Sequence, residues 1–430
     1  MIHRHPSRRD LFRGAVAPLI ITSTALGRGK VPPASDRVTI GFIGVGVRGG
    51  DGLIVQNLKL PEAQCVATCD PFKDRREKWA HKIDTRYAEL KGVGTYKSCA
   101  TYNEFRELLA RTDLDAVAIA TPDHWHVPIA IAAVKAGKDI YVEKPLGLTI
   151  RQNQALRKAV DRYQRIFQYG TQQRSSKHLR FGCELVRNGR IGKVHTVEVI
   201  APAGSAGGIK DPMPVPAGFD YDLWLGPAPV TPYTNDRCIG YGRYFIYDYS
   251  IGYIGGWGAH PLDIAQWGLD ADGTSPVEYE GTGVIPTEGL FDTITTWDVR
   301  CAYANGVKMK FTSGRVNLTK FIGPEGWIAI SREKIDAEPK SLLTSEIGAK
   351  EIHLHESTNH QGDFLKSVRS RAATVNPVES AVRSDAISHL SQIAIRTGRK
   401  IHWDPVKERI LGDDAAAKML ARPMRKPWHL

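Results

Sequence analysis

The sequence predicts an α/β domain with a doubly wound parallel sheet, followed by an α+β domain built on an open-faced, mainly antiparallel sheet. In residues 37–170, short apolar runs alternate with helical patterns, and such βαβ alternation requires parallel strands with right-handed crossovers. After residue 192, strand-length runs of alternating polarity follow one another with few helices between them, which is typical of antiparallel sheets. At 430 residues, with 42% hydrophobic and 24% charged side chains, the chain is long enough to bury two cores.

Residues 1–27 have the pattern of a twin-arginine signal peptide, which directs folded proteins across a membrane. Arg8 and Arg9 precede an apolar stretch, residues 15–26, that is too short to remain as a membrane span. We therefore expect export by the twin-arginine route to a periplasmic or other extracytoplasmic location. The alternative is a chance arginine pair beside a hydrophobic N-terminus. Residues 28–36 are rich in turn formers and are predicted to be a linker.

The first domain is predicted to span residues 37–170. Its expected strands are apolar runs bounded by turn signals or helical patterns, at 38–43, 64–69, 115–120, 139–142 and 165–169. The second domain is predicted to span residues 171–405. Its expected strands are 194–200, 277–284, 293–303, 307–312 and 326–330. Late helices at 362–371 and 380–397 are expected to pack back on one of the domains, and residues 406–430 are predicted to be a C-terminal tail.

The distribution of charge argues against a nucleic-acid partner, and the spacing of the cysteines argues against a metal site. The formal net charge is +12, but basic and acidic residues are interleaved and no block of like charge occurs, so we expect no nucleic-acid partner. The six cysteines show neither CxxC nor Cys/His metal spacing, so we expect free, mostly buried thiols and no metal site.

A glycine-rich turn follows the first predicted strand and opens a helix. Its glycines, Gly44, Gly46 and Gly49, match the G-x-G-x-x-G pattern that lets a pyrophosphate approach the backbone at a helix N-terminus. Arg48 lies within the turn and is expected to contact the cofactor as well. Asp70 ends the next strand, 21 residues after Gly49, where a carboxylate can accept hydrogen bonds from ribose hydroxyls and repel a 2′-phosphate. The cofactor is therefore predicted to be NAD rather than NADP. Nearby basic residues could instead pair with such a phosphate: Lys73, Arg75 and Arg76.

The carboxyl ends of the next two strands carry further candidates, because ligands of open α/β sheets bind at that edge. Thr121, Pro122 and His126 are expected to line the nicotinamide end of the cofactor, although the same segment also reads as a capped helix start. Glu143 and Lys144 follow the second of these strands and are also expected to contact the cofactor. A lysine there can hydrogen-bond a substrate hydroxyl and stabilise a developing oxyanion, and the alternative is an exposed ion pair.

Together, the GVGVRG turn, TPDHWH, EKP and the downstream His260-Pro-Leu-Asp263 segment resemble the glucose–fructose oxidoreductase / inositol dehydrogenase / MocA (Gfo/Idh/MocA) family over residues 37–400. The resemblance implies a Rossmann domain with an open-faced sheet domain, a nicotinamide cofactor, sugar, polyol or glycoside substrates, and homo-oligomers. It makes Lys144 a catalytic or substrate-orienting residue and His260 an acid/base candidate. Members commonly carry Asp-x-x-x-His, but Gly256 occupies the aspartate position here; Asp263 is the alternative catalytic partner of His260.

Further residues are candidates for substrate binding. Gln172 and Arg174 follow the last strand of the first domain and are expected to face the cleft, although polar residues at a helix start fit equally well. Trp257 offers a stacking surface for a sugar ring or else belongs to the core, and His360 is a cleft residue or a helix cap. Four tyrosines before His260 could also flank a sugar or pack a strand: Tyr244, Tyr247, Tyr249 and Tyr253.

These expectations predict an NAD-dependent oxidoreductase that takes a hydride from a sugar, polyol or glycoside hydroxyl. Because an exported enzyme has no dissolved NAD pool, its cofactor is expected to be tightly held and internally recycled. One alternative is a glycoside hydrolase similar to the family 109 enzymes, which oxidise C3 transiently. EKP and the absence of a Tyr-Pro-Thr-His segment near residue 255 argue against it. A second alternative is a non-catalytic carbohydrate-binding protein.

Overall fold

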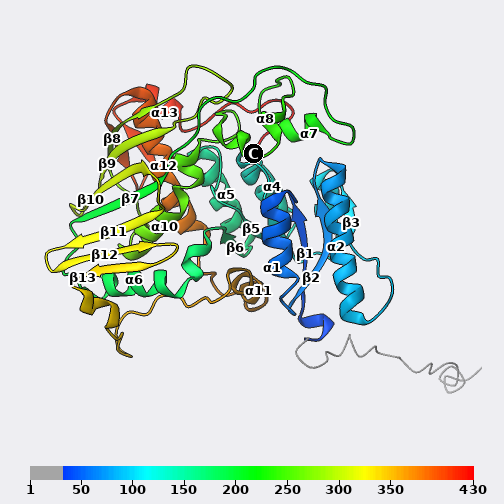
Figure 1. Cartoon of the computed structure of the whole chain (residues 1–430), viewed down its shortest axis with the longest axis horizontal. Coiled ribbons are helices and arrows are strands. Elements are labelled where there is room, and N and C mark those ends of the chain that lie inside the picture. The colour runs from blue at the N-terminus through cyan, green and yellow to red at the C-terminus, as the bar shows by residue number, and fades with distance from the viewer. Residues whose placement is uncertain (1–31) are drawn as a thin grey trace, which may run out of the picture.

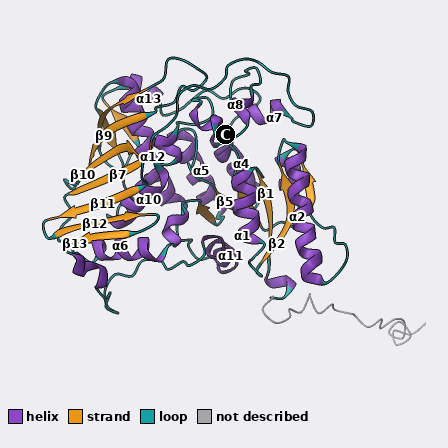
Figure 2. Cartoon of the chain, in the orientation of Figure 1, coloured by secondary structure: helices purple, strands orange, loops and turns teal. Residues whose placement is uncertain are grey.

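The computed structural model describes residues 32–430, so the predicted signal peptide and most of the predicted linker lie outside the described residues. Two sheets stand side by side, a parallel sheet near the N-terminus and a larger one after it (Figure 1). Helices surround the parallel sheet, whereas the larger sheet carries its helices on one face (Figure 2). This arrangement confirms the predicted fold class.

The first sheet has six parallel strands in the order β3-β2-β1-β4-β5-β6. This order reverses direction between β1 and β4, and ligands of doubly wound sheets bind at such a point. The strands are β1 Val38–Ile43, β2 Ala63–Cys69, β3 Ala100–Tyr102, β4 Ala116–Ile119, β5 Asp139–Val142 and β6 Phe167–Tyr169. Five of them were predicted, because strands covered by helices on both faces are almost continuously apolar.

Helices cover both faces of this sheet and bury two cores. A wide, π-type helical turn (Arg48–Ile54) leads into the first short helix, and the left-handed Gly92 ends the second helix. Thr149 caps the fifth helix by accepting a hydrogen bond from the Gln152 amide. The helices are α1 Val55–Asn57, α2 Lys73–Lys91, α3 Phe105–Leu109, α4 Asp123–Lys135 and α5 Ile150–Tyr163.

The second sheet has nine strands in the order β13-β12-β11-β7-β10-β9-β8-β14-β15. Only β10 and β7 pair in parallel, so the sheet is mainly antiparallel, as predicted. Four of its strands, β11, β13, β14 and β15, were not predicted. The strands are β7 Thr196–Pro202, β8 Glu278–Val284, β9 Thr296–Ala302, β10 Lys308–Gly314, β11 Leu318–Gly323, β12 Gly326–Ser331, β13 Ile335–Glu338, β14 Ile401–Asp404 and β15 Arg409–Leu411.

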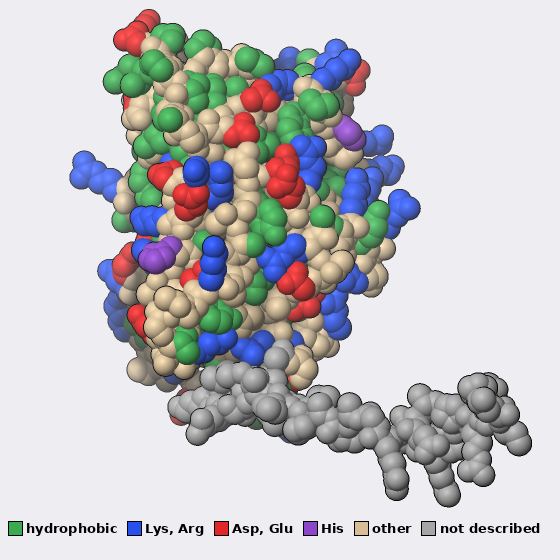
Figure 3. Space-filling model, turned by 90° about the vertical axis from the view of Figure 1, so that its right-hand side faces the viewer, with side chains coloured by type: hydrophobic (Ala, Val, Ile, Leu, Met, Phe, Trp, Pro, Cys, Tyr) green, Lys and Arg blue, Asp and Glu red, His purple; other side chains and the backbone are tan. Residues whose placement is uncertain are grey.

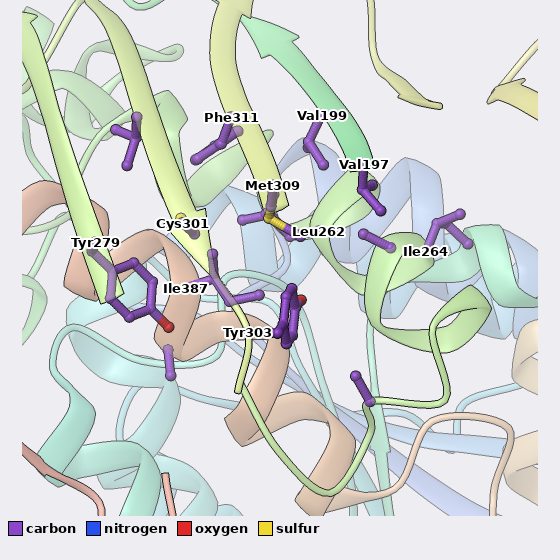
Figure 4. Packing of buried hydrophobic residues seen from close by; sticks show 14 of the residues in the cluster. Val197, Val199, Leu262, Ile264, Tyr279, Cys301, Tyr303, Met309, Phe311 and Ile387 are labelled. Atoms are coloured by element: carbon purple, nitrogen blue, oxygen red, sulfur yellow. The ribbon is translucent and has the colours of Figure 1, made fainter. Parts of the chain in front are cut away.

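One face of the second sheet forms the largest core. Side chains that alternate along its strands pack on α6 (Lys177–Arg187), α10 (Ala259–Gly268) and α12 (Val378–Thr397). Met309 and Phe311 from β10 and Leu262 of α10 all belong to this core (Figure 4). The opposite face is polar: Asp298 and Lys310 lie exposed on neighbouring strands, 3.9 Å apart.

Segments late in the chain return to the first domain. Phe364 and Leu365 of α11 (His360–Ser370) join the core beneath β1, and α12 contributes to cores of both domains. The predicted tail at 406–430 is not separate from the second domain, because β15 pairs with β14 and α13 (Asp414–Lys418) follows it. Trp428 then packs on Trp125 of α4, with ring centroids 4.7 Å apart. The chain thus ends against the first domain (Figure 1).

Shorter helices connect these elements. They are η2 Ala34–Asp36, η4 Gln172–Ser175, α7 Tyr221–Leu225, α8 Asn235–Cys238, η5 Gly242–Phe245, α9 Tyr253–Gly256 and η6 Lys340–Thr344. All six cysteines are free and buried, as expected. Among the described residues, no helix is both long and apolar enough to cross a membrane. On the face of the first domain seen in Figure 3, acidic and basic side chains are interspersed.

Phe311 provides a test of the second core. Its side chain is fully buried, and we expect Phe311→Ala to lower the free energy of unfolding by about 3–5 kcal/mol, because the truncation leaves a cavity. Urea unfolding followed by circular dichroism measures this loss. Val406→Ala, at an exposed position, is the control and should change stability by less than about 0.5 kcal/mol. Equal stability of the two variants would contradict the assigned core.

Candidate functional site

Two adjoining cavities lie at the carboxyl edge of the first sheet, between it and the second domain. The first, of about 520 Å³, is lined by the glycine turn and Asp70, and the second, of about 660 Å³, by Lys144, Trp257 and His260. Both cavities share the lining residues Val47, Asp51, Ala120, Thr121, Tyr241 and Arg243. A ligand in the first cavity can therefore reach a ligand in the second.

The three glycines of the turn serve different purposes. Gly44 has a φ of +81°, and a Cβ there would lie 2.6 Å from the Thr121 amide nitrogen. A Cβ on Gly49 would lie 1.9 Å from the Gly44 carbonyl oxygen, so packing demands glycine at both positions. A Cβ on Gly46 would meet only the Arg75 guanidinium, at 3.8 Å, and Gly46 lines the first cavity. Its bare backbone is therefore open to the pyrophosphate of a dinucleotide.

Asp70 and Thr121 also fit a dinucleotide in the first cavity. Asp70 accepts hydrogen bonds from the amides of Val45 (2.8 Å) and Phe72 (2.9 Å), and its burial raises its pKa. Each carboxylate oxygen keeps a further acceptor site for a hydroxyl donor such as a ribose. The hydroxyl of Thr121 is buried and has no partner among the described residues. Pro122 lines the same cavity.

The basic residues near Asp70 differ in how firmly contacts within the protein hold their side chains. Arg76 donates to the carbonyl of Asp70 and to the side chain of Asn103, which fixes its guanidinium. Arg75 lies over the Phe72 ring at 3.6 Å and lines the first cavity. Arg75 is therefore better placed than Arg76 to contact a bound nucleotide.

Arg48, Glu143 and Gln172 form a hydrogen-bonded group in the second cavity. The Nε of Arg48 lies 2.6 Å from Oε1 of Glu143, and Nε2 of Gln172 donates to the same oxygen at 2.9 Å. Arg48 was expected beside the cofactor, but the structure directs it to Glu143 and the second cavity. Gln172 also lines this cavity, and Oε1 of Glu143 accepts a third hydrogen bond from the Tyr141 hydroxyl at 3.2 Å.

Lys144 lies half-buried between two aromatic rings. Its Nζ donates to the Gly256 carbonyl oxygen at 2.8 Å and lies 5.6 Å from the ring centroid of Trp257 and 5.9 Å from that of Tyr244. Burial lowers the pKa of Lys144. One N–H bond is therefore fixed to the backbone, and the other two can be offered to a ligand oxygen.

His260, in the first turn of α10, is buried and lines the second cavity. Its Nδ1 has no hydrogen-bond partner among the described residues. Burial, together with the charges of Lys144, Arg332 and Arg48, holds the pKa of His260 well below its usual value of 6.5. The imidazole is therefore neutral near pH 7 and can accept a proton.

The structure places Asp263 and Arg174 away from both cavities, contrary to the expectation that they act in the cleft. Nε and Nη2 of Arg174 lie 2.8 and 2.7 Å from the two carboxylate oxygens of Asp263, and both side chains are buried. Arg174 also pairs with Asp272, while Thr171 and Asn376 donate to Asp263. A buried carboxylate needs such partners, and they leave Asp263 unavailable to His260 or to a substrate.

Two further histidines have their ring nitrogens engaged within the protein. The nitrogens of His126 lie 2.7 and 2.9 Å from the carbonyl oxygens of Pro145 and Thr121, although the side chain borders the second cavity. His360 lies against the Tyr169 carbonyl (2.9 Å) and the Ser175 hydroxyl (2.8 Å) and borders neither cavity. Asn359, not His360, caps α11. The expected substrate contact of His360 is therefore not part of this site.

The second cavity also contains residues that sequence reasoning missed. Arg243, Tyr241 and Arg332 line it, and only the folded sheet brings the turn that carries Arg332 to this place. Tyr244 was one of four tyrosine candidates and borders the cavity. Tyr247 lies instead between two guanidinium groups, those of Arg396 and Arg422.

Comparisons with known proteins match both domains. The family model for the Gfo/Idh/MocA oxidoreductases with an NAD-binding Rossmann fold matches residues 38–171. The model for the C-terminal alpha/beta domain of this oxidoreductase family matches residues 205–430. Together the two models cover most of the chain.

The chain is also similar to individual relatives. It is 34% identical over 124 residues to a "Glycosyl hydrolase family 109 protein" of Shewanella baltica, a match covering 29% of this chain and 26% of that relative. A Caulobacter crescentus aldose-aldose oxidoreductase structure has a TM-score of 0.62 at 16% identity, over 85% of this chain and 99% of that chain. GenD2 from gentamicin A biosynthesis, in complex with NAD, has a TM-score of 0.61 at 17% identity, over 88% and 98%. These structural likenesses show the fold.

Gly46 allows dinucleotide binding to be tested apart from stability. A side chain at Gly46 has room in the fold but enters the first cavity. We expect Gly46→Val to weaken NAD binding by at least about tenfold, as measured by calorimetry, while changing the free energy of unfolding by less than about 0.5 kcal/mol. Gly44→Ala is the contrasting variant and should lose stability as well, because of its positive φ and its contact with Thr121. Unchanged NAD affinity in Gly46→Val would show that the first cavity is not the dinucleotide-binding site.

His360 links burial to the pH dependence of stability. Its pKa is lowered by burial to about 4, from 6.5, so between these values the unfolded chain binds more protons and stability falls as pH decreases. We expect the stability difference between wild type and His360→Gln to shrink by about 1.4 kcal/mol per pH unit as pH falls across this range. Urea unfolding at several pH values measures it, with exposed His81→Gln as the comparison. Parallel curves for wild type and His360→Gln would contradict a neutral buried His360.

Proposed function

The chain belongs to the Gfo/Idh/MocA oxidoreductase family, and on that premise we propose that it transfers a hydride from a hydroxyl-bearing carbon of a sugar, polyol or glycoside to a nicotinamide dinucleotide. One observation carries this proposal. A lysine and a neutral histidine with an unpaired nitrogen share a cavity that adjoins the one fitted to a dinucleotide.

The first cavity provides the residues that would hold the cofactor. The bare backbone at Gly46 would face the pyrophosphate, Asp70 would accept from the ribose hydroxyls, and Thr121 and Pro122 would line the path toward the second cavity. When bound, a nicotinamide ring supplies the acceptor for a hydride. We propose NAD over NADP, because the Asp70 carboxylate would repel a 2′-phosphate.

The second cavity provides the groups that manage the proton and the charge. His260 would accept the hydroxyl proton at its unpaired Nδ1, which leaves the imidazole protonated. Lys144, held by the Gly256 carbonyl, would donate to the same oxygen and stabilise its developing negative charge. Trp257 and Tyr244 would offer aromatic surface to the sugar ring. Asp263 has no direct step here, since Arg174 neutralises it.

A second candidate is redox-neutral glycoside hydrolysis, favoured by the 34% identity to the family 109 relative. The matched stretch covers 26% of that relative, so the likeness concerns part of that protein. In this reaction the hydride would return to the sugar after the glycosidic bond has broken. The products separate the two candidates: a ketosugar marks net oxidation, whereas a free aglycone without accumulated NADH marks hydrolysis.

We also propose that the protein is exported in folded form and that its cofactor is recycled without leaving the site. The sequence of residues 7–12 and the apolar stretch after it support export. A dissolved NAD pool is absent outside the cytoplasm, which favours a retained cofactor. A homo-oligomer stays a prediction from the family resemblance.

Lys144 gives the direct test. We expect Lys144→Met to lower kcat by at least about 100-fold, because the variant cannot stabilise the oxyanion, while NAD affinity stays within about threefold of wild type. Turnover is followed by nicotinamide absorbance and NAD binding by calorimetry. Lys366→Met, at an exposed position on α11, is the control for loss of a lysine charge and should keep full activity. Wild-type turnover in Lys144→Met would refute the assigned role.

A further inference from the structure

The second cavity has an excess of positive charge. Four cationic side chains line it, against two carboxylates, and one of those carboxylates, Glu143, is paired with Arg48 at 2.6 Å. The other three cations are Lys144, Arg243 and Arg332. None of these three has an ion pair with a carboxylate in the described part of the chain. A neutral sugar would bring no further negative charge to these cations, and Arg332 is the most exposed of them.

Arg332 lies close to the groups proposed to act on the substrate. It belongs to the turn between β12 and β13, at the rim of the second cavity, and its side chain is exposed. Its guanidinium carbon is 5.3 Å from the ring centroid of Trp257. The same ring lies 5.6 Å from Nζ of Lys144 and 6.1 Å from the ring centroid of His260. Arg332, Lys144 and His260 thus all lie close to the Trp257 ring.

Arg243 differs from Arg332 in its position. It lies over the Tyr244 ring at 4.6 Å, donates to the Gly240 carbonyl, and lines both cavities. Its charge can therefore serve the dinucleotide as well as the substrate. Arg332 lines the second cavity only, so its charge is available to the substrate alone.

We propose that Arg332 makes the site selective for a sugar that carries an acid group, a carboxylate or a phosphate, and that its guanidinium binds this group while the sugar packs on Trp257. This inference rests on the proposed function, whose site it specifies. A guanidinium presents paired N–H donors that match the oxygens of either acid group, and such charge-assisted hydrogen bonds are stronger than those to a neutral hydroxyl. Arg332 is thereby a specificity-determining residue, separate from the proton-accepting His260.

The test compares three ligands: methyl glucoside, methyl glucuronide and glucose 6-phosphate. Each is measured with NAD-loaded wild type, Arg332→Gln, Arg332→Lys and Lys334→Gln, by turnover and by calorimetric binding. Lys334 lies in the same turn, is exposed and does not line the cavity, so Lys334→Gln removes an equal charge and is the matched control.

We expect wild type to bind one of the two acids at least about tenfold more tightly than the neutral glucoside. Arg332→Gln should lose that preference, because its KM for the acid should rise at least about tenfold more than its KM for the neutral glucoside. Arg332→Lys should recover part of the preference, and Lys334→Gln should keep all of it. The acid that shows the preference distinguishes a carboxylate from a phosphate ligand. Added salt should weaken binding of the acid more than binding of the glucoside.

Three outcomes would overturn the inference: equal affinity of wild type for acid and neutral sugars, equal losses for both classes in Arg332→Gln, or no saturable binding of either acid. Failure of the proposed function gives a different pattern. In that case an acid binds in an Arg332-dependent manner, but no ligand is oxidised or cleaved while NAD is bound. Turnover of the glucoside without an acid preference leaves the oxidoreductase assignment standing and removes the role of Arg332.

Discussion

The buried ion pair between Arg174 and Asp263 is the constraint on which the site depends. Both side chains are at most 1% exposed, so each charge would be very costly without the other. Arg174 follows the last strand of the first domain, and Asp263 lies in α10 of the second. Asn376, just before α12, donates to the same carboxylate. The pair therefore ties the segment that directly follows β6 of the first sheet to α10, one helical turn from His260. The Coulombic attraction and hydrogen bonds of the ion pair stabilise the position of α10 relative to the sheet edge that carries Lys144.

Gly256 occupies the position where the family resemblance leads one to expect an aspartate, and Lys144 is nevertheless held in place. An added Cβ there would meet only ordinary contacts, the nearest at 3.6 Å on Tyr244, so packing does not require glycine. The backbone carbonyl of Gly256 nevertheless fixes Lys144 at 2.8 Å, which needs no side chain. Gly256 supplies no carboxylate to His260, and among residues 32–430 no ion pair of His260 with a carboxylate is found. The glycine leaves the second cavity more positive than an aspartate at this position would, and this charge is the basis for the proposed acid-bearing substrate.

The sequence predicted the parts of the structure that follow from local patterns. Strands of the parallel sheet are apolar on both faces, and the glycine turn needs its first and third glycines for packing, so both were recognisable. Strands such as β13 and β15 are short and partly exposed at sheet edges, and their patterns resemble those of loops. The three-residue spacing predicted that Asp263 and His260 lie on one face of a helix. It could not show that the Asp263 carboxylate forms an ion pair with Arg174, which is distant in sequence. Arg332 has no local signal at all, because its distance to Trp257 depends on the register of β12 with β11 and β13.

The positive charges of the second cavity affect both the protonation of His260 and the proposed selection of an acid-bearing substrate. Lys144, Arg332 and Arg48 each disfavour a proton on His260 and, together with burial, keep it a free base. A bound acid group near Arg332 would offset part of that positive field. It would raise the proton affinity of His260 while the substrate hydroxyl is in place, so proton acceptance becomes more favourable when the correct substrate is bound. A neutral sugar would leave the field unchanged. In the proposed arrangement, substrate selection and the base strength of His260 would depend on the same group of charges.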